Sequence, residues 1–552
     1  MSRRTTTTTS TSQWFVRLAI DLRVPYDCHD EIRGRGNKTV LIPNRPLHTE
    51  RHRLRTLKVG VALTLTTLVL SSCVSGSEGG ADPNGTASPG APSGEGQSQA
   101  IATTSISSLS QPARIEVQAL ERGGEDMVTL RFEVFNDGDD QLNLQRAFTG
   151  DEGSGRRPSD VTLVDTRNAQ RYLPLQTDDG ECYCNEFEAR IDPGQSQEAW
   201  VTFPAPPADL DYLTALIPPA APFFDLPVSE GSGPPEEPAG SLQDPRILDL
   251  RFLQDDLSGE SSTDQTGDQL SIMLSSDVLF DTNESTLTNR AQEAIAEAAG
   301  QIDESGATQV QIDGHTDDTG DDDINDPLSE ARAESVEAEL SSAVTNDVTF
   351  ETAGHGSSDP VATNETEEGR QRNRRVTITF ERAQAPTSSS PSAAIPSSGT
   401  AAPPNTAGPQ VNQGELPVLG TSEHEEQAGV NAQVNHFSRS RDGYVALLWT
   451  IQNEGTERLN TGAGFRNEVY EYSPDADSGA TITDPTAQLR YHPLMDAETG
   501  CLCSPDLGRG ETNSVEPGQS VVRWSMYRLP AAVASSSIDI EHFGTIEDIA
   551  IP

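Results

Sequence analysis

The sequence predicts a multidomain chain in which a central α/β sandwich is flanked by two repeated all-β sandwich domains of immunoglobulin-like type. Alternating apolar segments recur late in the chain, with Val128 returning as Val445 and Trp200 as Trp524. Apolar residues at helical spacing are concentrated between these two segments, and Pro-, Gly- and Ser-rich breaks separate the pieces. Alternation favours half-buried strands, whereas mixed periods favour helices packed on a sheet.

Composition limits the partners of this chain. Its 552 residues allow several domains at about 150 residues each. Lys and Arg number 38 against 86 Asp and Glu, which gives a formal net charge of -48. So negative a chain is expected to avoid nucleic acid and anionic membrane surfaces. A solvated acidic surface and an adaptation to high salt both explain this composition, and the sequence leaves both open.

A targeting segment precedes the expected domains. Residues 51–58 are basic and residues 59–70 are apolar, which is long enough for a signal-peptide core and too short to span a bilayer. Leu70-Ser71-Ser72-Cys73 resembles a bacterial lipobox, and the resemblance implies that Cys73 carries a lipid. An uncleaved signal anchor is the alternative. We interpret residues 1–50, which include the run Thr5–Thr9, as a non-native N-terminal extension.

Shifts in composition divide the chain into eight expected parts. These are the extension (1–50), the lipoprotein signal peptide (51–73), a disordered tether (74–112), β-sandwich repeat 1 (113–228), a linker (229–245), the α/β domain (246–382), a disordered linker (383–430) and β-sandwich repeat 2 (431–552).

The two flanking domains share motifs in the same order. In the first, alternating residues from Val128 to Val134 lead into Asn136-Asp137-Gly138; in the second, Val445 to Ile451 lead into Asn453-Glu454-Gly455. Further matches are Arg171-Tyr172 with Arg490-Tyr491, Cys182-Tyr183-Cys184 with Cys501-Leu502-Cys503, and Pro193-Gly194 with Pro517-Gly518. Short strands and regular turn signals without a helical period predict a β-sandwich.

The middle domain alternates between strand and helix signals. We expect strands at 270–274, 278–280, 310–312, 348–350 and 376–380, and helices at 288–302 and 327–343. This order predicts a small sheet with its helices on one face.

Within this domain, four groups of residues occur in a fixed order. They are Gly314-His315-Thr316-Asp317, then Asn325, then Leu328-Ser329 with Arg332-Ala333, and finally Asn373-Arg374-Arg375-Val376. This order resembles the OmpA-like (OmpA/MotB C-terminal) peptidoglycan-binding domain over about residues 270–381.

The resemblance implies a ligand and a site. The ligand of that family is the stem peptide of peptidoglycan, held through diaminopimelate, whose side-chain end carries an ammonium and a carboxylate. By resemblance, Asp317 takes the ammonium and Arg332 takes the carboxylate, because a guanidinium binds a carboxylate with two parallel hydrogen bonds. The other expected binding residues are Thr316, Asn325, Leu328, Asn373 and Arg375. A purely structural ion pair between Asp317 and Arg332 is the alternative, and the family uses His315 structurally.

The cysteines allow several pairings. An exported chain meets oxidising conditions, so we expect Cys182 to bond with Cys184 and Cys501 with Cys503. A redox or metal role and other pairings stay open. We find no sequence motif for catalysis, a phosphate loop or a metal-binding helix, so the expectation is a non-enzyme without cofactor or metal.

Together these signals predict a lipoprotein of the cell envelope that ties a membrane to the cell wall. Its anchor would lie on the outer face of the cytoplasmic membrane in a Gram-positive cell and in the outer membrane in a diderm. The alternative is a surface receptor or envelope-assembly factor whose β-sandwich repeats bind a protein or small ligand. A motor-stator-like protein is disfavoured, because we find no transmembrane helix with an ionisable residue.

Overall fold

The computed structural model describes residues 100–551 apart from eleven gaps. The gaps are 107–111, 124–125, 145–146, 150–155, 219, 383–415, 461–464, 468, 471, 473–476 and 506–513. The expected extension (1–50), signal peptide with Cys73, most of the tether and most of the linker 383–430 lie outside the described residues. Within the described part, no helix combines the length and apolar character needed to cross a membrane.

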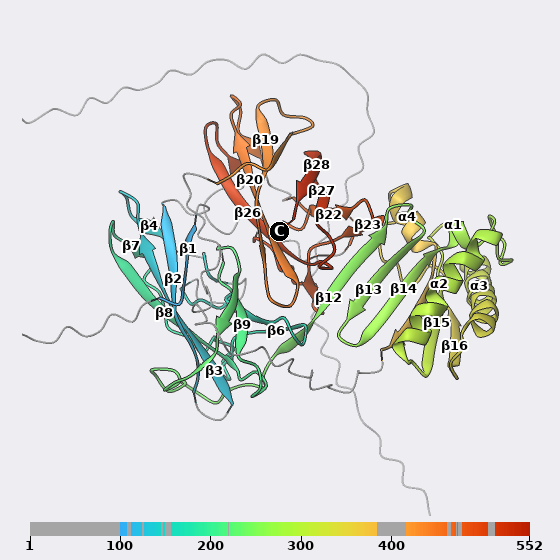
Figure 1. Cartoon of the computed structure of the whole chain (residues 1–552), viewed down its shortest axis with the longest axis horizontal. Helices are drawn as coiled ribbons and strands as arrows, with labels where there is room; N and C mark the ends of the chain where they lie inside the picture. The colour runs from blue at the N-terminus through green and yellow to red at the C-terminus, as the bar shows by residue number, and fades with distance from the viewer. Residues whose placement is uncertain are drawn as a thin grey trace, which may run out of the picture. The chain divides into compact units, whose positions relative to one another are not determined.

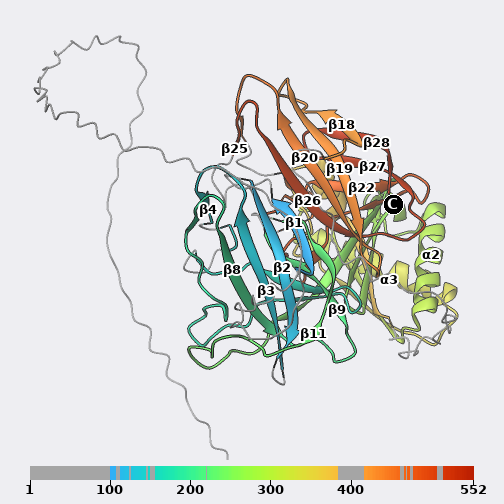
Figure 2. The same cartoon turned by 60° about the vertical axis from the view of Figure 1, so that its left-hand side comes forward.

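Two sheets face each other in the N-terminal β region. One has the strand order β1-β2-β3-β8, with β11 beside β2, and the other has the order β10-β9-β5-β6. The strands are β1 (Ala102–Ile106), β2 (Ala113–Arg122), β3 (Met127–Asn136), β4 (Leu142–Asn143), β5 (Thr162–Asp165), β6 (Gln170–Tyr172), β7 (Arg190–Ile191), β8 (Ser196–Pro204), β9 (Tyr212–Leu216), β10 (Phe223–Pro227) and β11 (Ser229–Glu230). Figure 2 shows β1, β2, β3 and β8 side by side.

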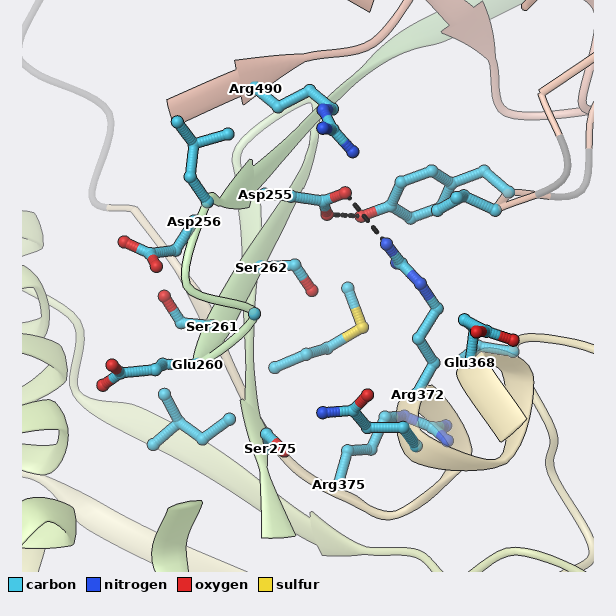
Figure 3. A pocket seen from close by; sticks show the side chains of 18 residues that line it. Asp255, Asp256, Glu260, Ser261, Ser262, Ser275, Glu368, Arg372, Arg375 and Arg490 are labelled. Carbon is cyan, nitrogen blue, oxygen red and sulfur yellow. Dashed lines mark hydrogen bonds and ion pairs between the residues drawn. The ribbon is translucent and has the colours of Figure 1, made fainter. Parts of the chain in front are cut away.

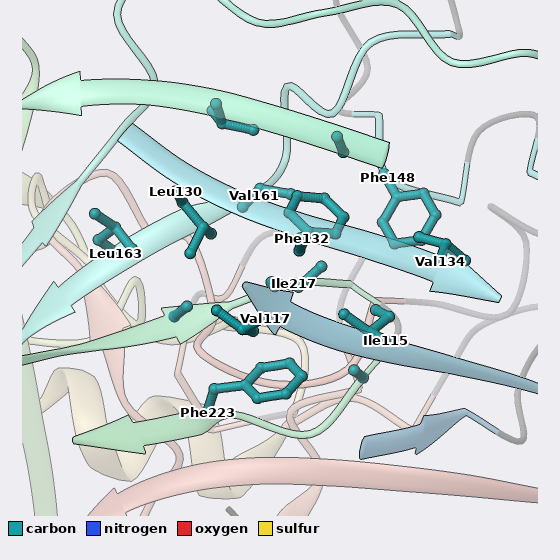
Figure 4. Close-up of a cluster of buried hydrophobic side chains, with 14 of the residues drawn as sticks. Ile115, Val117, Leu130, Phe132, Val134, Phe148, Val161, Leu163, Ile217 and Phe223 are labelled. Carbon is teal, nitrogen blue, oxygen red and sulfur yellow. The ribbon is translucent and has the colours of Figure 1, made fainter. Parts of the chain in front are cut away.

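Period-two alternation places the apolar residues of these sheets in one core. Ile115 and Val117 of β2 are fully buried, and so are Leu130 and Val134 of β3. Figure 4 shows them meeting side chains of the other sheet, including Phe223. Apolar burial of this kind is the main favourable term in folding.

The C-terminal β region repeats this arrangement. Its sheets have the orders β18-β19-β20-β26 and β23-β22-β27-β28. The strands are β18 (Gly420–Glu423), β19 (Val430–Arg439), β20 (Tyr444–Asn453), β21 (Leu459–Asn460), β22 (Ala480–Asp484), β23 (Leu489–Tyr491), β24 (Met495–Asp496), β25 (Ser514–Val515), β26 (Ser520–Arg528), β27 (Ser535–Ile540) and β28 (Gly544–Ala550).

Equivalent asparagines close a turn in both β regions. Asn136 is 1% exposed, accepts a hydrogen bond from Gly138 N and donates to Ile191 O. Asn453 is fully buried, accepts from Gly455 N and donates to Val515 O. The strand-to-turn motif therefore has the same structural role in both β regions. In each, a buried asparagine amide forms hydrogen bonds with backbone groups that the turn leaves unpaired.

The central region is a sheet with helices on one face. Strands run in the order β12-β13-β14-β17-β15-β16, and α2 and α3 pack against the buried residues of β14, β15 and β17. The elements are β12 (Ile247–Asp256), β13 (Ser261–Thr266), β14 (Gln269–Ser275), α1 (Ser276–Leu279), α2 (Asn289–Ser305), β15 (Gln309–Gly314), α3 (Asp322–Ala343), β16 (Thr349–Gly354), α4 (Glu367–Asn373) and β17 (Arg375–Glu381). Thr288 caps α2 by accepting from Ala291 N, and Gly306 ends it in a left-handed conformation.

Several details of this region differ from the sequence-based expectation. The strand expected at 278–280 is instead the single helical turn α1, whose Ser276 and Leu279 are buried. Helix α3 begins at Asp322 and carries Pro327 inside, so it starts five residues before the expected boundary. Its first turn holds Asp322 and Asp323, which the positive end of a helix favours. Helix α4 and the strands β12 and β13 were not expected at all.

Strand β12 joins all three regions. It pairs with β13 along one edge, while its other edge pairs with β6 through residues 247–249 and with β23 through residues 254–256. Figure 1 shows β12 between these partners. The Arg-Tyr motif common to both β regions lies in β6 and β23, so the two equivalent strands dock on the same central strand.

The four cysteines of the β regions form two local disulfides. Cys182 is bonded to Cys184 and Cys501 to Cys503, and all four are at most 9% exposed. In the described part of the chain, no group of three or more His, Cys, Asp or Glu side chains is arranged to hold a metal ion.

Candidate functional site

Asp317 lies just beyond the end of β15 and is only 7% exposed. Its Oδ1 accepts a hydrogen bond from Thr319 N at 2.9 Å, and its Oδ2 accepts one from Arg374 Nη1 at 2.7 Å. Burial alone would raise the pKa of Asp317, but these donors outweigh it and hold the pKa below its ordinary value. The residue is therefore a carboxylate at neutral pH, fixed in orientation by its own chain.

Arg374 was missing from the predicted site. Besides Asp317, its guanidinium pairs with Asp277 at 2.7 Å and Glu367 at 3.2 Å. The hydrogen bonds that Arg374 donates to Asp277 and Asp317 raise the pKa of Arg374, against the opposing effect of burial. The Arg374-Arg375 doublet was visible in the sequence, but only the start of β17 decides which of the two faces Asp317.

Arg332 projects from α3 and is 6% exposed. Its Nε donates to Glu284 O at 3.1 Å, and its guanidinium lies 5.1 Å from the centre of the Phe280 ring. Burial lowers the pKa of Arg332, and the nearby charges of Asp277 and Asp317 only partly oppose this. Among the described residues no carboxylate lies within ion-pair distance of Arg332, so Asp317 and Arg332 do not form a pair with each other.

Two paired glycines bring α3 close to the strands. Gly314 of β15 and Gly354 of β16 are register partners. A Cβ on Gly314 would lie 2.0 Å from Ser329 O, and one on Gly354 would lie 2.4 Å from Glu330 N. Only glycine leaves room for this approach of helix backbone to strand. Arg332 follows one turn later, so the glycine pair sets its distance from the sheet.

The expected neighbours of Asp317 divide into two groups. Thr316 and Asn325 lie beside it: Thr316 Oγ1 donates to Asp317 O at 3.0 Å, and Asn325 Nδ2 donates to Thr319 O at 3.3 Å. Both are buried and hold the loop that follows β15. Leu328 is half-buried on α3, one turn before Arg332.

Asn373 and Arg375 form their contacts away from Asp317. Asn373 is fully buried and uses its amide to bind Val361 N, Ala362 N and O, and Asn364 Oδ1. Arg375 donates to Asn373 O and Asp359 O and lines a cavity described below. Within the described part of the chain, neither residue forms a hydrogen bond or ion pair with Asp317 or Arg332, so the structure does not gather all the expected residues into one cluster.

His315 is buried at 6% exposure and stacks on His355 with 5.0 Å between ring centres. Burial and the charges of Arg375 and His355 lower the pKa of His315 to about 4, against the opposing effects of Asp313 and Asp359. The imidazole is therefore neutral at pH 7.

This burial predicts a pH-dependent stability. In the unfolded chain His315 has its ordinary pKa near 6.5, whereas in the folded chain its pKa is about 4. Between these two pH values the unfolded state binds more protons than the folded state. The free energy of unfolding therefore falls as the pH drops from about 6.5 to about 4. We expect a loss of about 2 kcal/mol between pH 7 and pH 5 from this residue alone. Urea unfolding of the wild type and His315→Phe checks this. The variant should lose less stability over the same range; equal losses would contradict it.

Part of the chain is similar to known proteins. The model of the OmpA family matches residues 279–374. The chain is 34% identical over 129 residues to the probable lipoprotein YiaD of Escherichia coli strain K12, covering 23% of this chain and 59% of that relative. It is 36% identical over 117 residues to the putative lipoprotein YfiB of the same strain, covering 21% of this chain and 72% of that relative.

Solved structures also align with part of the chain. The structure of the cell wall anchor of the T6SS from Pseudomonas aeruginosa aligns with 27% identity and a TM-score of 0.21, covering 23% of this chain and 90% of that one. The chain thus spans less than two thirds of the first curated relative and most of the aligned structure.

Proposed function

This chain belongs to the OmpA family, and on that premise we propose that its central domain binds peptidoglycan through the diaminopimelate residue of the stem peptide. The proposal places the ligand between the end of β15 and α3. Asp317 would receive the ligand ammonium, and Arg332 would receive the ligand carboxylate.

The state of Arg332 carries the proposal. A buried guanidinium without a counter-ion is unfavourable, because no neighbouring negative charge offsets the free-energy cost of removing it from water. Arg332 is in that state among the described residues, with a single hydrogen bond to a carbonyl. A ligand carboxylate would supply the absent partner and could accept two parallel hydrogen bonds.

Asp317 supports the second half of the proposal. Its carboxylate is ionised at neutral pH and is already oriented by Arg374 and Thr319, so little ordering is left for binding. Arg374 compensates part of its charge, which would weaken the grip on a cation. Asp277 also pairs with Arg374, so part of the positive charge of Arg374 is neutralised by Asp277 and not by Asp317.

The relatives extend the proposal to the whole chain. Two of them are named as lipoproteins, and this chain has its own lipobox-like segment ending at Cys73. We propose a lipid-anchored protein of the cell envelope that ties its membrane to the wall. We further propose that the two β regions are immunoglobulin-like repeats that contact a protein partner or act as spacers.

Sedimentation with insoluble sacculi tests the binding proposal. The full-length protein, purified in detergent, should co-sediment with sacculi whose stem peptides contain diaminopimelate, and free diaminopimelate should release it. Asp317→Asn should lower the affinity for the sacculi about tenfold or more, because a charge-assisted contact contributes about 1.5–3 kcal/mol.

Asp318→Asn is the matched control, since Asp318 is the exposed neighbour and the substitution makes the same chemical change. It should bind as the wild type does. Equal binding by Asp317→Asn and the wild type would refute the assignment of Asp317, and no release by free diaminopimelate would refute the ligand.

A further inference from the structure

A cavity of about 250 Å³ lies on the face of the central sheet opposite α2 and α3 (Figure 3). Its floor is one cross-strand row that runs through four strands. Arg490 of β23 is the register partner of Asp255 in β12, Asp255 of Ser262 in β13, and Ser262 of Met273 in β14. Register partners lie on the same face of a sheet, so these side chains form a continuous surface.

The roof comes from α4 and from the segment before β22. Gln371 and Arg372 of α4 and Val469 and Tyr470 line the cavity. Val469, Tyr470 and Arg490 come from the C-terminal β region, and the other lining residues come from the central region. Most of the lining lies outside residues 279–374, which the family model matches.

The charges around the cavity divide into a paired set and an unpaired set. Asp255 is neutralised within the protein: Arg372 lies 3.0 Å from its Oδ2, His492 Nε2 lies 2.8 Å from the same oxygen, and Tyr470 donates to Oδ1 at 2.5 Å. Glu260 pairs with Arg290. Arg375 and Arg490 have no ion-pair partner among the described residues.

The remaining carboxylates lie where solvent screens them. Glu368 is exposed and Asp256 is half-exposed, and both line the edge of the cavity with no resolved ion pair in the described part. Arg375, by contrast, is 6% exposed. Screening weakens the exposed charges far more than a buried one, so the inner part of the cavity favours an anion.

Polar atoms without partners surround the same cavity. Ser275 Oγ, Arg375 Nε and Arg490 Nε are all buried and have no hydrogen-bond partner in the described structure. Buried polar atoms nearly always have a hydrogen-bond partner in folded proteins. Three such atoms without a partner around one cavity therefore indicate that a polar ligand binds in it. The cavity holds several times the volume of one water molecule.

We propose that this cavity is a second binding site, distinct from that at Asp317, for a small organic anion whose carboxylate or phosphate group meets Arg490 and Arg375. The apolar part of the ligand lies on Met273 and Val469, and the hydroxyls of Ser262 and Ser275 complete the polar contacts. Because the floor and roof come from two regions, an occupant would bridge the wall-binding domain and the C-terminal β region.

Titration calorimetry of the full-length protein tests the site with two probes, inorganic phosphate and succinate, in a buffer without other polyvalent anions. We expect saturable binding of one anion per chain, and the better probe identifies phosphate or carboxylate as the recognised group. Arg490→Gln should weaken binding about tenfold or more, because it removes a charge-assisted contact. Arg458→Gln, at an exposed arginine outside the cavity, is the matched control and should bind as the wild type does.

A second variant separates binding from folding. Ser262→Met adds volume to the cavity floor without changing any charge, so it should abolish binding while the melting temperature stays within a few degrees of the wild type. Undisturbed binding by Ser262→Met, or no saturable binding of either probe by the wild type, would overturn the proposal. Normal affinity in Arg490→Gln would also overturn it.

Discussion

Replacing Arg332 with Gln is expected to lower the affinity for diaminopimelate-containing sacculi by about ten- to a hundredfold. The reason is that the variant loses a charge-assisted, two-pronged contact, which contributes about 1.5–3 kcal/mol. The same change should not destabilise the fold, because the wild type buries this charge without a counter-ion. Binding and stability are expected to separate, and sacculus sedimentation together with thermal unfolding measures both.

Two companion variants sharpen this test. Arg332→Lys keeps the positive charge but loses the planar fork, so it should recover only part of the binding. Arg290→Gln, at an exposed arginine on α2, should have no effect on sacculus binding. Full binding by Arg332→Lys would show that charge alone is sufficient, and full binding by Arg332→Gln would remove Arg332 from the site.

Gly314→Ala is expected to destabilise the central domain by about 1–3 kcal/mol and to reduce sacculus binding at the same time. Its Cβ would lie 2.0 Å from Ser329 O and 2.8 Å from Ser329 C. Both Ser329 atoms belong to the backbone of α3, so no side-chain rotation can relieve the clash. Helix α3 must then move from β15, and Arg332 moves with it. Urea unfolding and sedimentation of the same preparation measure the two effects.

Gly300→Ala provides the matched control for this substitution. A Cβ on Gly300, in the middle of α2, meets nothing within 4 Å. Alanine should therefore raise the stability by about 0.5–1 kcal/mol through its better helix propensity. If Gly314→Ala were as stable as the wild type, the close approach of α3 to β15 would not be required by the fold.

Local patterns predicted the central elements well where the pattern itself defines the element. The helix expected at 288–302 is α2, because a capping threonine and a helical period coincide there. The strand expected at 278–280 failed, because three residues alternate equally well in one helical turn and in a strand. The start of α3 failed because acidic residues suit both a loop and the first turn of a helix.

The positions of the candidate site residues in the fold were predictable from the sequence, but their pairings were not. Asp317 and Arg332 are both buried at the end of β15 and on α3, as their motifs suggested. That Asp317 pairs with Arg374, however, depends on where β17 begins and on three-dimensional proximity across 57 residues of chain. Arg375 instead lines the cavity beside β12, β13 and β14 for the same reason. Sequence spacing carries neither piece of information.

The position of β12 has a consequence for how the chain acquires its structure. One edge of this strand needs β6, some 75 residues upstream, and β23, more than 230 residues downstream. Contacts of such long separation form slowly, because a large loop must close before they give any stabilisation. Until residues 489–491 arrive, the end of β12 is an unpaired strand edge, which can recruit another chain. The C-terminal β region therefore completes the fold of the domain before it, and a chain that ends early is expected to aggregate.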